Sequence, residues 1–140
     1  MEIKFKKLNE NAVEPKQGTP FSAGFDLVAV SKEQLDMYHT RFGTGLAFEI
    51  PEGYVGLVFA RSSCYKNGSL LTNGVGVIDS DYRGEVMAVF LGTSKDICYD
   101  IGDRICQLVI MPIPQVKFIF TEKLSETERG TGGYGSTGNK

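Results

Sequence analysis

The sequence predicts an all-β fold, a jelly-roll-like β-barrel followed by a flexible, glycine-rich C-terminal arm. Short apolar runs recur along the 140 residues, and glycine, proline, asparagine and aspartate punctuate them, which is typical of strands joined by tight turns. No repeat, linker or low-complexity block interrupts this pattern before the tail. We therefore expect one barrel domain over residues 1–125 and an arm over residues 126–140.

The apolar runs give the expected strands in chain order. They cover residues 3–5, 25–30, 45–50, 54–60, 75–78, 86–91, 104–111 and 116–120. Residues 32–42 fit either a short helix or further strand, because their periodicity does not decide between the two. Residues 64–69 have room for one helical turn.

Charge and apolar patterning exclude several classes of function. The chain has 15 basic and 17 acidic residues, so no basic field attracts long nucleic acid, and any phosphate site must be local. The most apolar segment, residues 107–120, is interrupted by Pro112, Pro114 and Lys117 and is too short to span a bilayer. The N-terminal residues lack a signal-peptide core, so we expect a cytoplasmic protein without a membrane partner.

Thiol and imidazole groups are sparse. Cys64, Cys98 and Cys106 form no C-x-x-C pair, and His39 is the single histidine. A structural zinc site is therefore not expected, and no Cys/His pair is available for nucleophilic catalysis.

The tail from Arg129 to Gly138 combines five glycines with an arginine, an aromatic ring and three hydroxyls. Glycine lets backbone N–H groups converge on an anion, since no Cβ forbids positive φ angles. Arg129, Ser136 and Thr137 add donors for phosphate oxygens, and Tyr134 offers a flat face for stacking. One interpretation is an arm that orders over a phosphorylated, ring-bearing ligand. The other is an unstructured terminus.

A second polar segment runs from Gly76 to Glu85, where an apolar run leads into a turn rich in charge. Asp79 could act as a general base that orients and deprotonates a water molecule. We expect Asp81 to pair with an arginine and Tyr82 to pack against a sugar. The alternative is a polar hairpin turn in which aspartate acts only as a turn former.

Three further positions place polar groups beside apolar runs. Arg61, Ser62 and Ser63 follow the run 54–60 and supply a guanidinium and two hydroxyls for phosphate, although either serine could instead cap a helix. Asp26 and Gln107 each interrupt an apolar run, and a carboxylate in such a place is either paired or serves a cation.

These segments, in this order, resemble the five motifs of the trimeric dUTP diphosphatase (dUTPase) family. The matching stretches begin with Ala23-Gly24-Phe25-Asp26-Leu27 and continue through Arg61-Ser62-Ser63, residues 76–85, residues 102–108 and residues 129–138. Cys106 stands where the family usually has alanine, and Tyr134 where it usually has phenylalanine. The resemblance implies a homotrimer of jelly-roll subunits with three active sites at subunit interfaces. It also implies Mg²⁺-dependent hydrolysis of dUTP to dUMP and diphosphate, which limits uracil in DNA and supplies dUMP for dTMP synthesis.

By the same resemblance, Asp79 orients the water that attacks the α-phosphorus, and Asp26 reaches the metal through water. The hairpin 73–79 reads uracil, Tyr82 lies under the deoxyribose, and the tail closes over the nucleotide. The substrate-binding residues that the resemblance implies are Arg61, Ser62, Ser63, Asn73, Gly76, Tyr82, Gln107, Arg129, Tyr134, Gly135, Ser136 and Thr137.

Three alternatives stay open at this point. A dCTP deaminase shares the fold and the Arg-Ser-Ser type of loop, but it fits Asp79, Tyr82 and the tail less well. A nucleotide-sensing protein could bind a regulatory protein partner and hydrolyse only secondarily. A purely structural jelly roll would leave five ordered polar motifs without a purpose.

Overall fold

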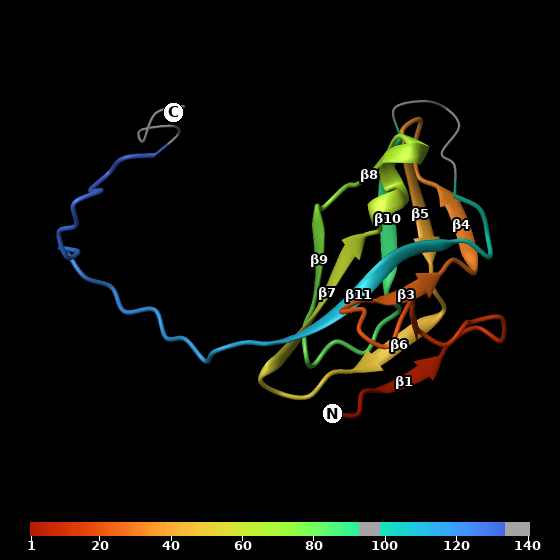
Figure 1. Ribbon diagram of the computed structural model, residues 1–140, viewed down its shortest axis with the longest axis horizontal. Coiled ribbons are helices and arrows are strands. Elements are labelled where there is room, and N and C mark those ends of the chain that lie inside the picture. Colours follow the sequence, from red (N-terminus) through yellow and green to blue (C-terminus); the bar gives the residue numbers. More distant parts are fainter. Residues whose placement is uncertain (93–98, 134–140) are drawn as a thin grey trace.

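The protein folds into a barrel of eleven short strands, described here by a computed structural model for residues 1–92 and 99–133 (Figure 1). The strands are β1 (Lys4–Lys7), β2 (Lys16–Gln17), β3 (Phe25–Val28), β4 (Ser31–Gln34), β5 (His39–Gly43), β6 (Leu46–Glu49), β7 (Tyr54–Ala60), β8 (Ser69–Leu71), β9 (Val75–Ile78), β10 (Met87–Gly92) and β11 (Arg104–Pro112). One 3-10 helix, η1 (Ser62–Asn67), follows β7. Within the described residues, no helix is long and apolar enough to cross a bilayer.

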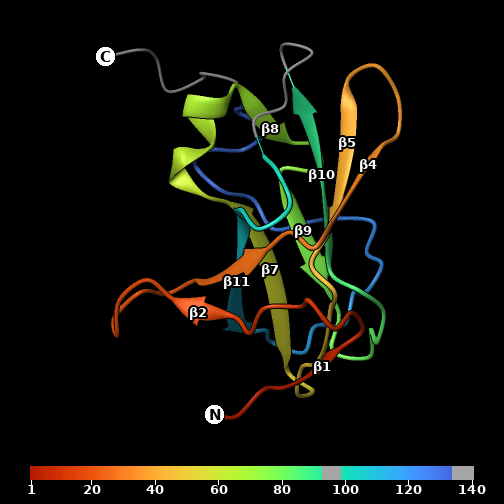
Figure 2. The same cartoon turned by 90° about the vertical axis from the view of Figure 1, so that its right-hand side faces the viewer.

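Two antiparallel sheets enclose the core. One has the order β2-β3-β11-β7-β9 and the other β4-β5-β10-β8, while β1 and β6 form a separate pair. In Figure 2, β2 and β3 extend the first sheet outward from β11 and β7. Phe42 of β5, Phe90 of β10 and Tyr99 pack edge-on or tilted in the interior, with ring centroids 5.2–6.3 Å apart. The expected all-β, jelly-roll-like barrel is confirmed.

Several local expectations are now decided. Residues 32–42 form a strand hairpin rather than a helix, with β4 and β5 joined by the turn 35–38. The expected helical turn near 64–69 is the 3-10 helix η1, which begins two residues earlier. The strands β2 and β8 were not expected from the sequence. Both are only two or three residues long, so neither contributes a readable period.

The expected strand over residues 116–120 is wrong. The last strand, β11, ends at Pro112, and the chain beyond it runs away from the barrel (Figure 1). Val116, Phe118, Ile119 and Phe120 have 72–97% of their surface exposed. An apolar run forms a strand only where it pairs with another strand, and no described strand pairs with residues 116–120. The expected arm boundary at residue 126 falls within this extended segment and stays a prediction.

The central strand β11 contains a β-bulge between Arg104 and Cys106. Side chains alternate between the two faces of a regular strand, but Ile105 and Cys106 are consecutive and both fully buried. Beyond the bulge, Gln107 lies opposite Asp26 of β3 and Phe59 of β7. The bulge therefore sets which β11 side chains face the candidate site.

Candidate active site

Asp26 of β3 lies between two guanidinium groups. Its Oδ1 accepts from Arg61 Nε at 2.9 Å, and its Oδ2 accepts from Arg104 Nη1 at 3.0 Å. The Asp26 side chain is 16% exposed, so its charge is partly desolvated and is compensated by these two partners. The sequence predicted that this carboxylate is either paired or serves a cation, and the structure shows it paired with Arg61 and Arg104.

Arg61 follows directly after β7 and is the residue that precedes η1. Besides its bond to Asp26, its Nη1 approaches the Arg104 carbonyl oxygen at 3.3 Å and Ser63 Oγ at 3.5 Å. A guanidinium carries five N–H donors, and in the described part of the chain Nη2 has no partner. Ser62 is exposed and Ser63 half-buried on the same loop. Arg61 is thus held by Asp26, Ser63 and the Arg104 carbonyl, while the two Nη2 donors have no partner among the described residues.

Gln107 of β11 lies next to this group, since it is paired with Asp26 across the sheet. Its Nε2 donates to the Ala60 carbonyl oxygen at 3.1 Å, which fixes the amide at the end of β7. A Cβ on Gly24 would collide with the Gln107 amide, so glycine is needed there for the amide to keep its place. Asp26, Arg61 and Gln107 therefore gather at one end of three adjacent strands.

The segment between β8 and β9 is a tight turn built on Asn73 and Gly74. Gly74 has φ of +67°, its N–H donates to Leu71, and Val75 N donates to the Asn73 carbonyl at 2.7 Å. The following strand β9 is an edge strand of its sheet, with Val75 and Val77 exposed. Gly76 lies so close to Val58 of β7 that a Cβ would be 3.1 Å from the valine Cβ. β8 and β9 belong to different sheets, so residues 73–79 form a turn and an edge strand rather than the expected hairpin. They present backbone groups and an apolar edge to the outside.

Asp79 comes directly after β9, and its side chain is exposed. It lines an open cleft of about 930 Å³ together with Arg83 and the Lys4–Glu49 ion pair, whose atoms are 3.0 Å apart. Tyr82 N donates to the Asp79 carbonyl at 3.2 Å, so the turn folds back toward the strand end. Asp79 has the solvent access that a group acting on water requires.

The turn after Asp79 is ordered differently from the expectation. Asp81 has no ion pair with an arginine in the part of the chain that is described. Arg83 instead donates from Nη1 to the carbonyl oxygens of Ser80 and Tyr82, at 2.7 and 2.9 Å. Carbonyl oxygens left free in a tight turn can accept hydrogen bonds from a guanidinium, and here they take the place of the expected carboxylate. The Tyr82 hydroxyl donates to the Glu85 carbonyl at 3.1 Å, which fixes its ring over Gly84.

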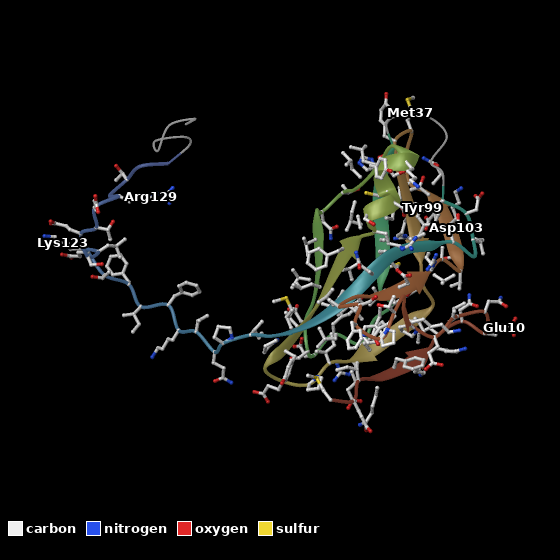
Figure 3. All side chains as sticks on the ribbon, viewed as in Figure 1. Glu10, Met37, Tyr99, Asp103, Lys123 and Arg129 are labelled. Carbon is white, nitrogen blue, oxygen red and sulfur yellow. The ribbon has the colours of Figure 1, made fainter. Side chains whose placement is uncertain are left out.

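A single chain brings only some of its predicted site residues together, because Asp79 lies far from Arg61. In the register of β7 and β9, Ile78 lies opposite Gly56, whereas Arg61 lies beyond Ala60. At about 3.3 Å per residue, the four residues from Gly56 to Ala60 alone separate the two groups by about 13 Å along the strand. Arg129 lies far out on the arm (Figure 3), where its Nε donates to Gly132. The remaining tail predictions, Tyr134, Gly135, Ser136 and Thr137, lie outside the described residues.

The described thiols and the histidine are distant from this chemistry or unsuited to it. Burial, and then the nearby Asp26 charge, raise the pKa of the Cys106 thiol to about 12, so it stays protonated in the core. Cys64 is a half-buried free thiol, and Cys98 lies outside the described residues. His39 begins β5 and contacts Asp36 at the hairpin tip. The described residues contain no group of three or more side chains that could hold a metal ion.

Comparison with known proteins identifies the family. The dUTPase family model matches residues 10–138, which is nearly the whole chain. This chain belongs to the dUTPase family. A protein of Nautilia profundicola named deoxyuridine 5′-triphosphate nucleotidohydrolase is 43% identical over 142 residues, which cover 99% of each chain. A protein of the same name from Desulfitobacterium hafniense is 46% identical over 130 residues, 89% of this chain and 86% of the relative.

Solved dUTPase structures share the fold. A G164S mutant of the dUTPase of Staphylococcus bacteriophage 80alpha, with dUpNHpp, has a TM-score of 0.86 and 26% identity, with 98% of each chain covered. The dUTPase of Staphylococcus aureus phage phi11, described with a structural Mg(II) ion, has a TM-score of 0.76 and 23% identity. It covers 90% of this chain and 100% of its own. The predicted resemblance is therefore confirmed at the level of family and fold.

Sequence reasoning missed one residue of this dUTPase site. Arg104 contacts Asp26 with its side chain and Arg61 with its carbonyl oxygen, yet it was not among the predicted site residues. A signal was present: two consecutive core residues, Ile105 and Cys106, separate Arg104 from Gln107. Two adjacent buried residues in a strand indicate a bulge, and a bulge returns Arg104 to the face of Gln107.

Proposed function

We propose that this protein hydrolyses dUTP to dUMP and diphosphate with Mg²⁺. The observation that carries the proposal is the group formed by Asp26, Arg61 and Gln107 within a chain of the dUTPase family. Cleavage of a phosphoanhydride depends on positioning and charge neutralisation more than on a protein nucleophile. An arginine with two unpaired donors among the described residues, two hydroxyls and an oriented amide meet that need.

The phosphate chain would bind at Arg61, Ser62, Ser63 and Gln107. Arg61 Nη2 can donate two hydrogen bonds to phosphate oxygens without giving up its bond to Asp26, since that bond uses Nε. Gln107 keeps one N–H and its carbonyl oxygen beyond the bond to Ala60. The polyphosphate would thus meet donors that are already oriented.

The residues present fit Mg²⁺ in a specific way. Mg²⁺ prefers oxygen ligands and keeps several waters, so a triphosphate can supply much of its inner shell. Asp26 accepts one hydrogen bond on each carboxylate oxygen, and each oxygen therefore keeps a lone pair for a water bound to the ion. The bound ion would neutralise charge that develops on the phosphate oxygens.

The opposite end of the site would read the nucleoside and activate water. Asp79 would orient the attacking water and accept its proton. Residues 73–79 would contact uracil through their backbone groups, through Gly76 and through the Asn73 amide, and the Tyr82 ring would lie under the deoxyribose. Its hydroxyl bond to Glu85 holds the ring in one orientation. In the tail, Arg129, Tyr134, Gly135, Ser136 and Thr137 would close over the bound nucleotide.

The separation of Asp79 from Arg61 supports a shared site in a homotrimer. The phosphate end of one subunit would face the Asp79 end of another, because a single chain holds the two apart along β7. The exposed apolar segment 116–120 and the exposed valines of β9 support association as well, since monomeric proteins rarely leave such surface uncovered. Analytical ultracentrifugation would test the predicted trimer.

A diphosphate-release assay across dUTP, dTTP, dCTP and UTP, with and without Mg²⁺, tests the proposed reaction. Selective, Mg²⁺-dependent turnover of dUTP is the expected result. Ammonia release from dCTP would instead favour the deaminase alternative. Binding of dUTP without turnover would favour a nucleotide sensor.

A further inference from the structure

Arg104 has a position that none of the proposed roles uses. Its side chain is 57% exposed and donates to Asp26 Oδ2 at 3.0 Å, while its carbonyl oxygen accepts from Arg61 Nη1 at 3.3 Å. It is thus in contact with both the carboxylate proposed to face the metal and the arginine proposed to face phosphate. In an otherwise exposed arginine, two such contacts point to a role in the site.

The bulge in β11 is what brings Arg104 to this place. Counting back from Gln107, regular alternation would put Arg104 on the core face of the sheet. The bulge lets Ile105 and Cys106 both enter the core, so Arg104 turns outward to the face that carries Asp26 and Gln107. Its carbonyl lies beyond the last paired residue of β7, where the Arg61 side chain satisfies it.

We infer that Arg104 is a positioning residue for Asp26, an inference that rests on the proposed function. A carboxylate beside a single arginine can form a two-bonded fork with it, using Nε and Nη2 together. Here Arg104 holds Oδ2, so Arg61 engages Oδ1 through Nε alone. Arg104 thereby keeps Arg61 Nη2 available for phosphate and fixes the direction of both Asp26 oxygens. Without Arg104, the carboxylate rotates onto Arg61 and takes one of the two Nη2 donors from the substrate.

A double-mutant cycle tests this positioning role. The affinity of the purified protein for dUpNHpp is measured by calorimetry at saturating Mg²⁺ for Arg104→Gln, Asp26→Asn and the double variant. Arg104→Gln should weaken binding about tenfold, at the lower end of the range for residues that orient a metal-site ligand. In the Asp26→Asn background the same change should have an effect of less than about twofold, because residues that act through one another are not additive.

Two further variants separate positioning from folding. Arg104→Lys keeps the charge and one donor to Asp26, so its affinity should lie between those of wild type and Arg104→Gln. Arg41→Gln is the matched control, because Arg41 also joins a strand carboxylate, that of Glu33, but in the other sheet. It should bind dUpNHpp as wild type does.

The possible outcomes are distinct. Additive losses for Arg104→Gln and Asp26→Asn would overturn the inference and assign Arg104 a direct phosphate contact instead. Unchanged affinity in Arg104→Gln would overturn it as well. Wild-type protein that binds dUpNHpp but does not cleave dUTP would contradict the proposed function alone, since the cycle needs no turnover. Wild-type protein that does not bind the analogue would overturn both.

Discussion

Gly24 lies so close to the Gln107 amide that any side chain at position 24 would displace it. A Cβ on Gly24 would be 3.1 Å from the Gln107 Cδ and 3.2 Å from its Cβ. The main chain before β3 therefore sets the position of an amide on β11. The strands β3 and β11 are distant in the sequence but paired in the sheet. The glycine of the Ala23-Gly24 pair is thus required by close approach and not by a turn.

Gly24→Ala should weaken substrate binding more than it destabilises the fold. The Gln107 amide is the end of a flexible side chain, so it can swing away from the new methyl group, but its bond to the Ala60 carbonyl is then lost. Steady-state kinetics should show a higher KM for dUTP, with a thermal midpoint within a few degrees of wild type. Gly18→Ala is the control, because its Cβ would meet Ser22 Oγ at an ordinary 3.6 Å. An unchanged KM would show that Gln107 does not bind phosphate.

Asp79→Asn should lower kcat for dUTP hydrolysis by about 10²–10⁴, the range for loss of a general base. The KM should change little, since a group that orients water hardly contacts the ground state of the substrate. Asp81→Asn, on the same turn, is the matched control and should keep most of the activity. A kcat close to wild type in Asp79→Asn would remove this carboxylate from the proposed mechanism.

Deletion of residues 129–140 should leave a folded barrel with low activity. In the described part of this segment, residues 129–133, Arg129 bonds only to Gly132 within the arm itself, so that part gives up no hydrogen bond to the barrel. A single charge-assisted hydrogen bond to phosphate contributes about 1.5–3 kcal/mol, so kcat/KM should fall at least about tenfold. Circular dichroism and a dUTP assay on the same preparation would test both halves. Loss of the β-sheet spectrum would show instead that the arm supports the fold.

The tip of the β4–β5 hairpin should lose stability in acid. Asp36 accepts from the Tyr38 N–H at 2.8 Å and contacts the His39 ring, and these bonds, the Tyr38 bond foremost, lower the pKa of its carboxyl below 3.8. A carboxyl with a lowered pKa in the folded state stabilises that state above its unfolded pKa, and the effect disappears as the pH falls through the folded pKa.

Wild-type protein should therefore be more stable than Asp36→Asn at pH 6, and the difference should shrink once the pH is below about 3.8. Thermal unfolding of the two proteins at both pH values would measure it. Because Asp36 is fully exposed, the difference should be small. A gap between the two midpoints that is equal at both pH values would mean that Asp36 acts through its shape and not its charge.

The sequence predicts well the strands that are apolar runs bounded by turn residues, and poorly the strands that depend on their neighbours. The expected strands 54–60 and 75–78 have the bounds of β7 and β9, because each is an apolar run bounded by turn residues. Residues 116–120 carry an equally strong apolar signal, yet no strand forms, because pairing depends on an edge that sequence alone does not reveal. The strand β2 is missed for the opposite reason. Its two residues are polar, and they form a strand because they pair with β3.

The site shows a similar division. Asp26, Arg61 and Gln107 were predicted as separate positions, and the sheet register brings them together. The arginine partner expected for Asp81 was wrong, because hydrogen bonds to carbonyl groups leave no trace in the residue pattern. The contribution of Arg104 depends on a single extra residue in one strand, which the adjacent apolar residues Ile105 and Cys106 indicate and their burial establishes.

The distance between Asp79 and Arg61 along β7 has a genetic consequence if the proposed trimer forms. A subunit damaged at one end still carries the other end intact. Two inactive alleles, one altered at Asp79 and the other at Arg61, would then rescue each other when expressed in the same cell, because some mixed assemblies would pair two sound ends. Two alleles damaged at the same end would never do so. A protein whose sites each lay within one chain would show no such complementation.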